Sequence, residues 1–310
     1  MALLIVVTPR LAPCTRPWAQ GAENHAPMKA MSAMTTSLVF IIPVRHPRSV
    51  TDWSALQSYL RQTLASVSAQ TSTNWECVVV ANAGAPLPDM PRNCRIVRVD
   101  LPLPDLPDRK ADRQLYYDAV RHDKGLRIYA GLKGIADTSY VMVVDFDDFV
   151  HCGLAAFVDA HRDAPGWNIN EGYVWSGGGW CFAKPGFHMM CGTSHIIRRD
   201  LLGSFSMANG DPDIAAIKRR LGSHIFIHED LAAQGYPLQD LPFAGAVYRI
   251  GNPQSTSGSG QLAAVMTPLS DMLTHPVRFF RKALRYRRVT QDLRRKFTLP
   301  DNPWSACPER

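Results

Sequence analysis

The 310-residue sequence is 46% hydrophobic, 20% charged and 9% aromatic, proportions that exclude a disordered or fibrous chain. Its net charge of +7 suggests a nucleic-acid-binding protein, but the segment 278–296 holds nine Arg and Lys residues against a single acid. The rest of the chain has 25 bases and 26 acids, so the positive charge is local and we expect no nucleic-acid partner.

The first half of the chain alternates between apolar runs and helical periodicity. Residues 1–36 show no sustained pattern and are expected to be a disordered or loosely ordered extension. The β-branched run over 37–44 predicts a strand that is buried on both faces of a parallel sheet. Apolar residues then recur every three or four positions over 53–67, which predicts an amphipathic helix, and 76–81 predicts a second strand.

A short strand is predicted next over 95–99, then a mostly helical stretch over 110–136, and then a buried strand that begins at residue 139. Beyond residue 150 we predict helices over 153–162, 212–221 and 229–235, and strands over 188–198 and 246–250. Strands that alternate with helices indicate the α/β class, with a mainly parallel central sheet and flanking helices. We expect one domain over 37–265 and a basic C-terminal tail over 266–310.

The strand from residue 139 runs directly into Asp145-Phe146-Asp147-Asp148. Open α/β sheets bind ligands outside the carboxyl ends of their strands, so chemistry is expected here. Asp145 and Asp147 alternate along the chain and can project to the same side, where oxygen ligands favour Mg²⁺ or Mn²⁺ together with substrate phosphates. We predict a metal site at Asp145 and Asp147; the alternative is that these acids cap the next helix or merely end the strand.

A second chemistry uses a similar turn. Haloacid-dehalogenase-type phosphatases also place Asp-x-Asp after an apolar strand, with the first Asp as nucleophile, which would be Asp145 here. Their motif lies on the first strand and carries Thr or Val two places after its second Asp. In this chain Phe149 occupies that place and the strand comes late, so a metal-dependent phosphatase is kept as an alternative function.

Four segments stand in a characteristic order: IIPV (41–44), VVVANAG (78–84), DKGLRIYAGLKGIADTSYVMVVDFDD (123–148) and HEDLAAQGYPLQDLP (228–242). This order resembles the inverting family 2 glycosyltransferases of the GT-A fold, over about 70% of the chain. The resemblance implies a GT-A-like domain of the nucleotide-diphospho-sugar transferase type. Such an enzyme moves a sugar from a nucleotide diphosphate, expected to be UDP, to a saccharide or lipid-linked acceptor with inversion, using Mn²⁺ or Mg²⁺.

By this resemblance Pro43 and Val44 border the nucleotide base, and Asn82 occupies a base-recognising position that is Asp in the family. An amide can both donate to and accept from a base edge, so binding can survive this departure. Lys124 falls on the family's Lys-Gly and would approach the base or the diphosphate; the alternative is a solvated helix residue. Asp145 would contact the ribose or the metal.

The resemblance also assigns the reacting groups. Asp147 would bind the metal that stabilises the departing nucleoside diphosphate. Asp230 matches the general base that takes the proton of the acceptor hydroxyl, although Glu229 and Asp230 could simply be acids at a helix N-terminus. Trp175, Trp180 and Glu229 are expected on the acceptor side, where aromatic rings cover sugar faces; the alternative for the tryptophans is an ordinary core edge.

A third alternative is a catalytically silent glycan- or nucleotide-binding protein of the same fold. It is favoured by Asn82 and by the segment YRIGNPQSTS (248–257), where the family often has a His near the diphosphate. A shared fold does not establish turnover. The donor, the metal and the acceptor therefore stay expectations at this point.

The location of the protein follows from its ends and its thiols. Seven scattered cysteines without zinc-type spacing predict buried thiols in a reducing compartment, and the apolar start lacks the basic region of a signal peptide. We expect a cytoplasmic protein. Aromatic and basic residues interleave over 278–296, which predicts that this segment contacts an anionic membrane surface, on the cytoplasmic side of the membrane. The alternative is a charged face in contact with solvent.

Overall fold

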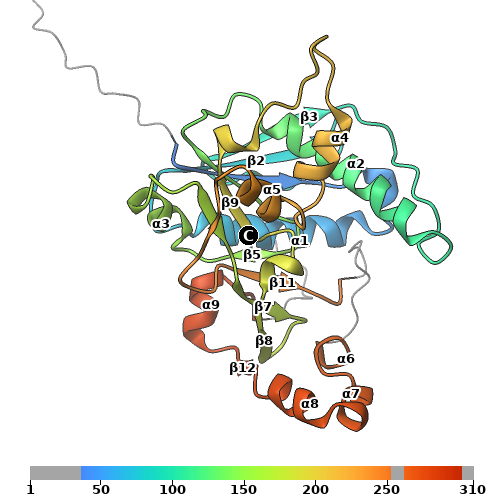
Figure 1. Cartoon of the computed structure of the whole chain (residues 1–310), viewed down its shortest axis with the longest axis vertical. Coiled ribbons are helices and arrows are strands. Elements are labelled where there is room, and N and C mark those ends of the chain that lie inside the picture. Colours follow the sequence, from blue (N-terminus) through green and yellow to red (C-terminus); the bar gives the residue numbers. More distant parts are fainter. Residues whose placement is uncertain (1–35, 253–261, 302–310) are drawn as a thin grey trace, which may run out of the picture. The chain divides into compact units, whose positions relative to one another are not determined.

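The computed structural model describes residues 36–252 and 262–301 (Figure 1). Apart from Thr36, the predicted N-terminal extension lies outside the described residues. A seven-stranded sheet has the order β10-β6-β9-β4-β1-β2-β3. Its strands are β1 (Leu38–Pro43), β2 (Trp75–Asn82), β3 (Cys94–Val99), β4 (Tyr140–Val143), β6 (Gly166–Asn168), β9 (His195–Arg198) and β10 (Gln239–Asp240).

This sheet is mainly parallel. Strand β1 pairs in parallel with β2 and β4, β2 pairs in parallel with β3, and β6 with β10, whereas β9 runs antiparallel to β4 and β6. The fold class predicted from the sequence, an α/β protein with a mainly parallel central sheet between helices, is confirmed.

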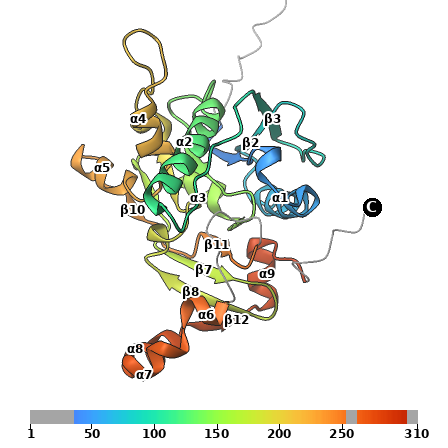
Figure 2. The same cartoon turned by 90° about the vertical axis from the view of Figure 1, so that its right-hand side faces the viewer.

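The central strands are apolar throughout because both faces of the sheet are covered. On β1, Phe40 and Ile42 face one buried cluster with helices α1 (Trp53–Ser68) and α3 (Leu154–Ala160). Val39 and Ile41 face a second cluster with helix α2 (Arg113–Gly131). Figures 1 and 2 show α1 and α2 on opposite sides of the sheet. This explains the uninterrupted run over 37–44, since alternate side chains enter different cores.

The helix starts have clear local causes. Asp52 precedes α1 and accepts a hydrogen bond from the backbone N–H of Ala55 at 2.9 Å. Asp112 caps α2 in the same way through Leu115, at 2.8 Å. Each cap satisfies a backbone donor that has no partner inside the helix. The predicted helices over 53–67 and 110–136 are therefore confirmed, with sharper boundaries.

A second sheet of five strands has the order β12-β8-β7-β11-β5. Its strands are β5 (Phe149–Val150), β7 (Glu171–Trp175), β8 (Trp180–Pro185), β11 (Ala246–Arg249) and β12 (Tyr286–Arg288). The residues between β4 and β5, which we call the acidic turn (Asp145–Asp148), lead the chain from the first sheet into the second. The Gly-rich stretch around residue 178 connects β7 and β8, which pair antiparallel, a hairpin that the sequence pattern did not predict.

Short helical segments cover the α2 side of the large sheet. They are η3 (Arg199–Leu202), α4 (Ile214–Ala216), η4 (Ile217–Leu221) and α5 (Ile227–Ala233). Segment η1 (Pro47–Ser49) follows β1, and η2 (Phe187–Met189) packs through Phe187 in the cluster that contains α1 and α3. Segment η4 is a π-helical turn that continues α4. Ile217 and Leu221 of this turn are buried in the cluster that contains α2.

The C-terminal part contains α6 (Leu262–Met266), α7 (Leu269–Thr274), α8 (Pro276–Ala283), β12 and α9 (Gln291–Phe297). Strand β12 pairs with β8, and Leu293 and Phe297 of α9 are buried against Phe149 and Val247. Residues 286–299 are thus part of the folded body, whereas the sequence predicted a separate tail over 266–310. The apolar residues that pack this segment are few and stand among many basic residues, so the sequence pattern did not predict their burial. No helix within the described ranges is both long and apolar enough to cross a bilayer.

Candidate functional site

A cavity of about 680 Å³ opens at the carboxyl ends of β1 and β4. Pro43, Asp145 and Asp147 lie on its wall, at the position where parallel α/β sheets bind ligands. The cavity is strongly charged. Its cationic side chains are Arg45, Arg113, Arg121, Lys124 and Arg127, and its acids are Asp123, Asp145 and Asp147.

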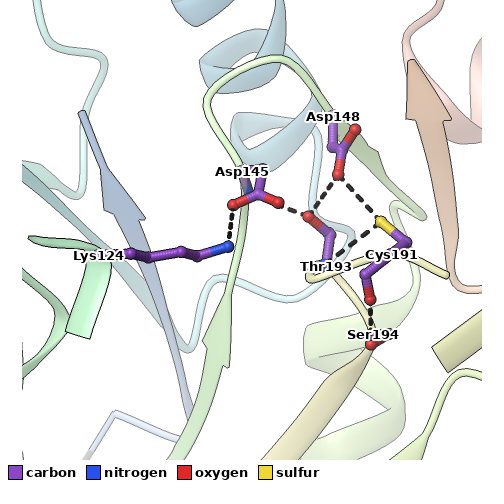
Figure 3. A network of polar contacts seen from close by, with 6 residues as sticks. All are labelled: Lys124, Asp145, Asp148, Cys191, Thr193 and Ser194. Atoms are coloured by element: carbon purple, nitrogen blue, oxygen red, sulfur yellow. Dashed lines mark hydrogen bonds and ion pairs between the residues drawn. The ribbon is translucent and has the colours of Figure 1, made fainter. Parts of the chain in front are cut away.

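The acidic turn is held by a network of buried polar groups (Figure 3). The hydroxyl of Thr193 donates to Asp148 Oδ2 at 2.6 Å and accepts from the backbone N–H of Asp145 at 2.9 Å. Cys191 Sγ donates to the same Asp148 oxygen at 3.2 Å, and the backbone N–H of Arg249 donates to Asp148 Oδ1 at 3.1 Å. Asp148 is therefore a structural group that ties the turn to the neighbouring segments.

Asp147 is also buried, and its Oδ2 accepts a hydrogen bond from Asn252 Nδ2 at 2.6 Å. Burial raises the pKa of Asp147 to about 6; the charge of Asp145 adds to this effect, while Asn252 and Arg249 oppose it. Burial and the charges of Asp147 and Asp145 raise the pKa of Asp148 well above its usual range. The turn thus concentrates negative charge that the surrounding protein compensates incompletely.

Arg249 is a buried cation whose charge interacts with the charges of Asp147 and Asp148. Its guanidinium donates to Gln62 Oε1 at 2.6 Å and lies over the ring of Phe149, 4.5 Å from the centroid. Its Nε and Nη1 have no hydrogen-bond partner among the described residues. Burial lowers the pKa of Arg249 to about 10, against the opposing charges of Asp147 and Asp148.

Asp145 and Lys124 form an ion pair on the cavity wall, with Lys124 Nζ 2.5 Å from Asp145 Oδ1. Burial lowers the pKa of Lys124, but the charge of Asp145 and the hydrogen bond to it outweigh that effect and leave the pKa raised. Gly192 makes room for the pair, since a Cβ there would lie 2.8 Å from Lys124 Nζ and 2.9 Å from Asp145 Oδ2. Lys124 thus lies on the cavity wall in an ion pair, and its contact with a nucleotide stays a prediction.

Of the residues predicted to border the nucleotide base, only some line the cavity. Pro43 lines the cavity, whereas Val44 is buried in the core and its backbone N–H donates to Val80. Asn82 is also buried and does not line the cavity: its Nδ2 donates to the carbonyl of Leu101 at 2.7 Å, and its Oδ1 accepts from Arg127 at 2.8 Å. The roles predicted for Val44 and Asn82 are therefore corrected to packing and support.

Asp123 is the carboxylate that Asn82 supports through Arg127. Arg127 is 1% exposed and donates to both oxygens of Asp123, at 2.9 and 2.8 Å. This bidentate pair fixes the Asp123 carboxylate on the cavity wall. Sequence reasoning missed Asp123 and Arg127, although Asp123 immediately precedes the Lys124-Gly125 pair.

The structure does not bring Asp230 to this cavity. Asp230 lies on α5, where Arg219 donates to both of its carboxylate oxygens at 2.8 and 2.6 Å. Both residues line a separate surface hollow that contains none of the acids of the acidic turn. The structure thus places the Asp230 carboxylate in an ion pair away from the cavity, and the predicted catalytic base at this position has no support from the geometry.

The predicted acceptor residues do not line the cavity either. Trp175 is fully buried, packs against Phe149 and donates from Nε1 to Gly178, so it belongs to the core. Trp180 is half exposed and lies beside the guanidinium of Arg288, 5.4 Å from the ring centroid. Glu229 is exposed on α5. The expectation of an aromatic acceptor wall formed by these tryptophans is therefore corrected.

His224 also lines the cavity, although no sequence motif predicted it. Gly222 places it there: a Cβ on Gly222 would lie 2.1 Å from the backbone oxygen of Arg121, so only glycine lets this segment approach α2 so closely. His224 bonds to the backbone of Met189, and its buried Nε2 has no partner among the described residues. Burial and the charge of Lys124 lower the pKa of His224 to about 4, which leaves the ring neutral at pH 7.

No three His, Cys, Asp or Glu side chains within the described part of the chain are grouped so as to hold a metal ion by themselves. Asp145 and Asp147 supply two carboxylates to one cavity. Mg²⁺ and Mn²⁺ are commonly bound by one or two carboxylates, with substrate phosphates and water as the remaining ligands. The donor set therefore fits a cation that arrives with a phosphate-bearing ligand.

No family model matches the chain, and no curated protein matches it by sequence. Solved structures show a faint likeness. Protein Rv0371C of Mycobacterium tuberculosis H37Rv, in complex with manganese, is 10% identical over 72% of this chain and 96% of its own, with a TM-score of 0.35. The enzyme 4-diphosphocytidyl-2C-methyl-D-erythritol synthase of Anaerococcus prevotii is 13% identical over 71% of this chain and 91% of its own, with a TM-score of 0.33.

An active-site mutant of LgtC is 13% identical over 84% of this chain and 100% of its own, with a TM-score of 0.29. All three scores are low, so the fold assignment depends on the sheet topology described above. What the site does must be argued from its own residues.

Proposed function

We propose that this protein is a metal-dependent transferase that binds a nucleotide diphosphate sugar in the cavity and transfers the sugar to a hydroxyl acceptor with inversion. The observation that carries the proposal is the convergence of Asp145, Asp147 and Lys124 on one cavity wall at the end of β4. The segment order that resembles the family 2 glycosyltransferases supports it independently, because that order was read from the sequence.

In this proposal the cavity divides into two ends. Pro43, Leu106 and Tyr117 form apolar surface that suits a nucleobase, and the fixed carboxylate of Asp123 accepts a hydrogen bond from the nucleoside. Arg45 and Arg121 contribute positive charge for the diphosphate. Asp123 thereby takes the position that the resemblance gave to Asn82.

Asp145 and Asp147 would hold the divalent cation, which supplies charge stabilisation for the departing nucleoside diphosphate when bound. The raised pKa of Asp147 is consistent with this role, since a divalent cation would favour its charged form. Lys124 keeps the carboxylate of Asp145 oriented through their ion pair.

Transfer to a hydroxyl group needs a base that accepts its proton. We assign this role to His224, because it lines the cavity and its Nε2 has no partner among the described residues. Asp230, the position matched by the resemblance, is paired with Arg219 on another surface.

A thermal-shift experiment on the full chain, with UDP-sugars and other nucleotide sugars in the presence and absence of Mn²⁺, tests the proposal. We expect stabilisation when donor and metal are both present, because a ligand that binds the folded state raises its stability. Failure of every nucleotide sugar to stabilise the protein with Mn²⁺ would refute it. Trapping of a phospho-aspartate on Asp145 would support the phosphatase alternative, and donor binding without any sugar release would support a silent binding protein.

A further inference from the structure

Helices α7 and α8 expose a row of large apolar side chains. Leu273 is 82% exposed, Val277 67%, Phe280 62% and Leu284 76%. Val277, Phe280 and Leu284 are spaced three and four residues apart along α8 and its C-cap, so they lie on one side of that helix, and Leu273 stands near the end of α7; we call these four side chains the apolar stripe. Single exposed apolar residues are ordinary, but a contiguous stripe marks a surface that is covered by a partner.

The partner that contacts the apolar stripe should be negatively charged. Between Met272 and Gln291 the sequence contains six Arg and Lys residues and no acid. Arg278, Arg281 and Arg285 are exposed, and they line a groove of about 930 Å³ between α8 and β8 together with Lys184. The same two helices thus present an apolar row and a concentrated positive charge.

This combination fits the interface of an anionic bilayer. Apolar side chains enter the acyl boundary while arginines reach the headgroup phosphates, and each cation near such a surface adds to the attraction. A nucleic acid would match the charge and leave the stripe in water. Both views of the fold place α7 and α8 beyond β8 and β12, away from the seven-stranded sheet, so the stripe is accessible (Figures 1 and 2).

The groove also adjoins the candidate active site. Met190 lines both the groove and the cavity that contains Asp145. The groove itself combines the apolar side chains of Phe182 and Met266 with its cationic rim. A lipid whose phosphate is held by this rim would carry its headgroup past Met190 toward the cavity.

We propose that α7 and α8 dock the protein on an anionic membrane through the apolar stripe and its arginines, and that the groove presents a phosphate-bearing lipid as the acceptor. The acceptor part depends on the proposed function, whereas the docking part does not. Docking is therefore tested by vesicle binding alone.

The experiment is co-sedimentation of the full chain with phosphatidylcholine vesicles that either contain or lack phosphatidylglycerol. We expect sedimentation with the anionic vesicles and little with the neutral ones. The double variant Phe280→Ser/Leu284→Ser should weaken binding about tenfold or more, because it removes two side chains from the apolar contact. Arg278→Gln/Arg281→Gln should weaken it as well, and added salt should have the same effect on the unchanged protein.

The matched control is Met207→Ser, which removes an apolar side chain of similar exposure (56%) from a loop outside α7 and α8. It should bind vesicles like the unchanged protein. Thermal unfolding of every variant should match the unchanged protein, since the substituted side chains are exposed.

Absence of binding to anionic vesicles, equal binding to neutral ones, or full binding by the stripe variant would overturn the proposal. Loss of a dimer in the stripe variant, measured by light scattering without lipid, would do so as well, because the stripe would then be covered by a second copy. Vesicle binding without any nucleotide-sugar binding would remove the proposed function and leave docking intact.

Discussion

The acidic turn and helix α8 both concentrate charge of one sign, but they hold it in different ways. In the turn each carboxylate has a specific partner: Lys124 for Asp145, Asn252 for Asp147 and Thr193 for Asp148. On α8, Arg278 and Arg281 extend into solvent beside exposed apolar side chains.

The difference shows how each region can recognise a ligand. Buried carboxylates in fixed positions interact strongly and at short range, so they suit one compact ligand with defined geometry. Exposed cations are screened by salt and act through their sum, so they suit an extended surface with many equivalent phosphates. Single substitutions should therefore have large effects in the turn and small effects on α8.

The largest effect is expected from Asp147→Ala. This variant removes one of two carboxylates proposed to hold the metal, so it should lower metal-dependent binding of the nucleotide sugar at least about 100-fold, which corresponds to about 3 kcal/mol. Titration calorimetry with and without Mn²⁺ measures it. Asp292→Ala, an exposed aspartate on α9, is the control and should bind normally. Normal binding by Asp147→Ala would break the contrast between the two regions.

His224→Gln should lower the rate of sugar transfer about 100-fold or more while donor binding persists, because an amide does not accept a proton at neutral pH. Asp230→Asn should keep its rate, since Asp230 is paired with Arg219 outside the cavity. Single-turnover assays at saturating donor separate transfer from binding. The reverse result, with Asp230→Asn inactive and His224→Gln active, would restore the base implied by the family resemblance.

Asp147 should make the stability of the metal-free protein fall, relative to the Asp147→Asn variant, as the pH rises from about 4 to about 6; the lowered pKa of His224 acts in the opposite direction in both proteins. The pKa of Asp147 is about 6 when folded and 3.8 ordinarily, so in this range the folded state holds a proton that the unfolded state has released. The shift corresponds to about 3 kcal/mol of unfolding free energy. Urea unfolding across this range measures it, and Asp147→Asn should lose correspondingly less stability. A pH dependence of stability identical to that of Asp147→Asn would contradict the buried, weakly compensated turn.

Thr193→Val should lower the unfolding free energy by about 2 kcal/mol. The substitution keeps the shape of the side chain but removes the shorter of two hydrogen bonds to the buried Asp148 oxygen and leaves the N–H of Asp145 without its partner. Thr71→Val, at an exposed position whose hydroxyl bonds to Cys152, should change stability much less. Equal effects in chemical denaturation would show that the network around the turn contributes nothing special.

The smallest effect is expected on α8 and in the residues that directly follow it. Arg281→Gln and Arg285→Gln should each change the unfolding free energy by less than about 0.5 kcal/mol, because both side chains are exposed. Thermal and urea unfolding of the single variants check this. A loss comparable to that of Thr193→Val would mean that these arginines support the fold.

The sequence predicted the parts of the site that depend on local pattern. An apolar run that ends in acids located Asp145 and Asp147, because strand burial and strand ends are visible in the order of residues. Lys124 was found through its Lys-Gly motif. Lys124 meets Asp145 because α2 packs on the sheet at β4, where Ile128 and Val141 share one buried cluster.

The sequence did not reveal partners that are distant along the chain or hidden by composition. Asp230 was predicted to be a base because the adjacent sequence gives no sign of its ion pair with Arg219, eleven residues earlier. Asn82 looked like a ligand residue, yet Arg127 and Leu101 occupy both ends of its amide. His224 had no motif at all, since its position depends on the close approach at Gly222.

The packing of α9 affects how the membrane proposal can be tested by deletion. The backbone N–H of Cys152 donates to the carbonyl of Lys296 at 2.8 Å, and Phe297 is buried beside Phe149, the first residue after the acidic turn. A chain that ended at residue 275 would lack β12 and α9 as well as α8. It would expose the five-stranded sheet and loosen the support of the acidic turn, so a deletion would fail through misfolding whether or not the membrane is bound.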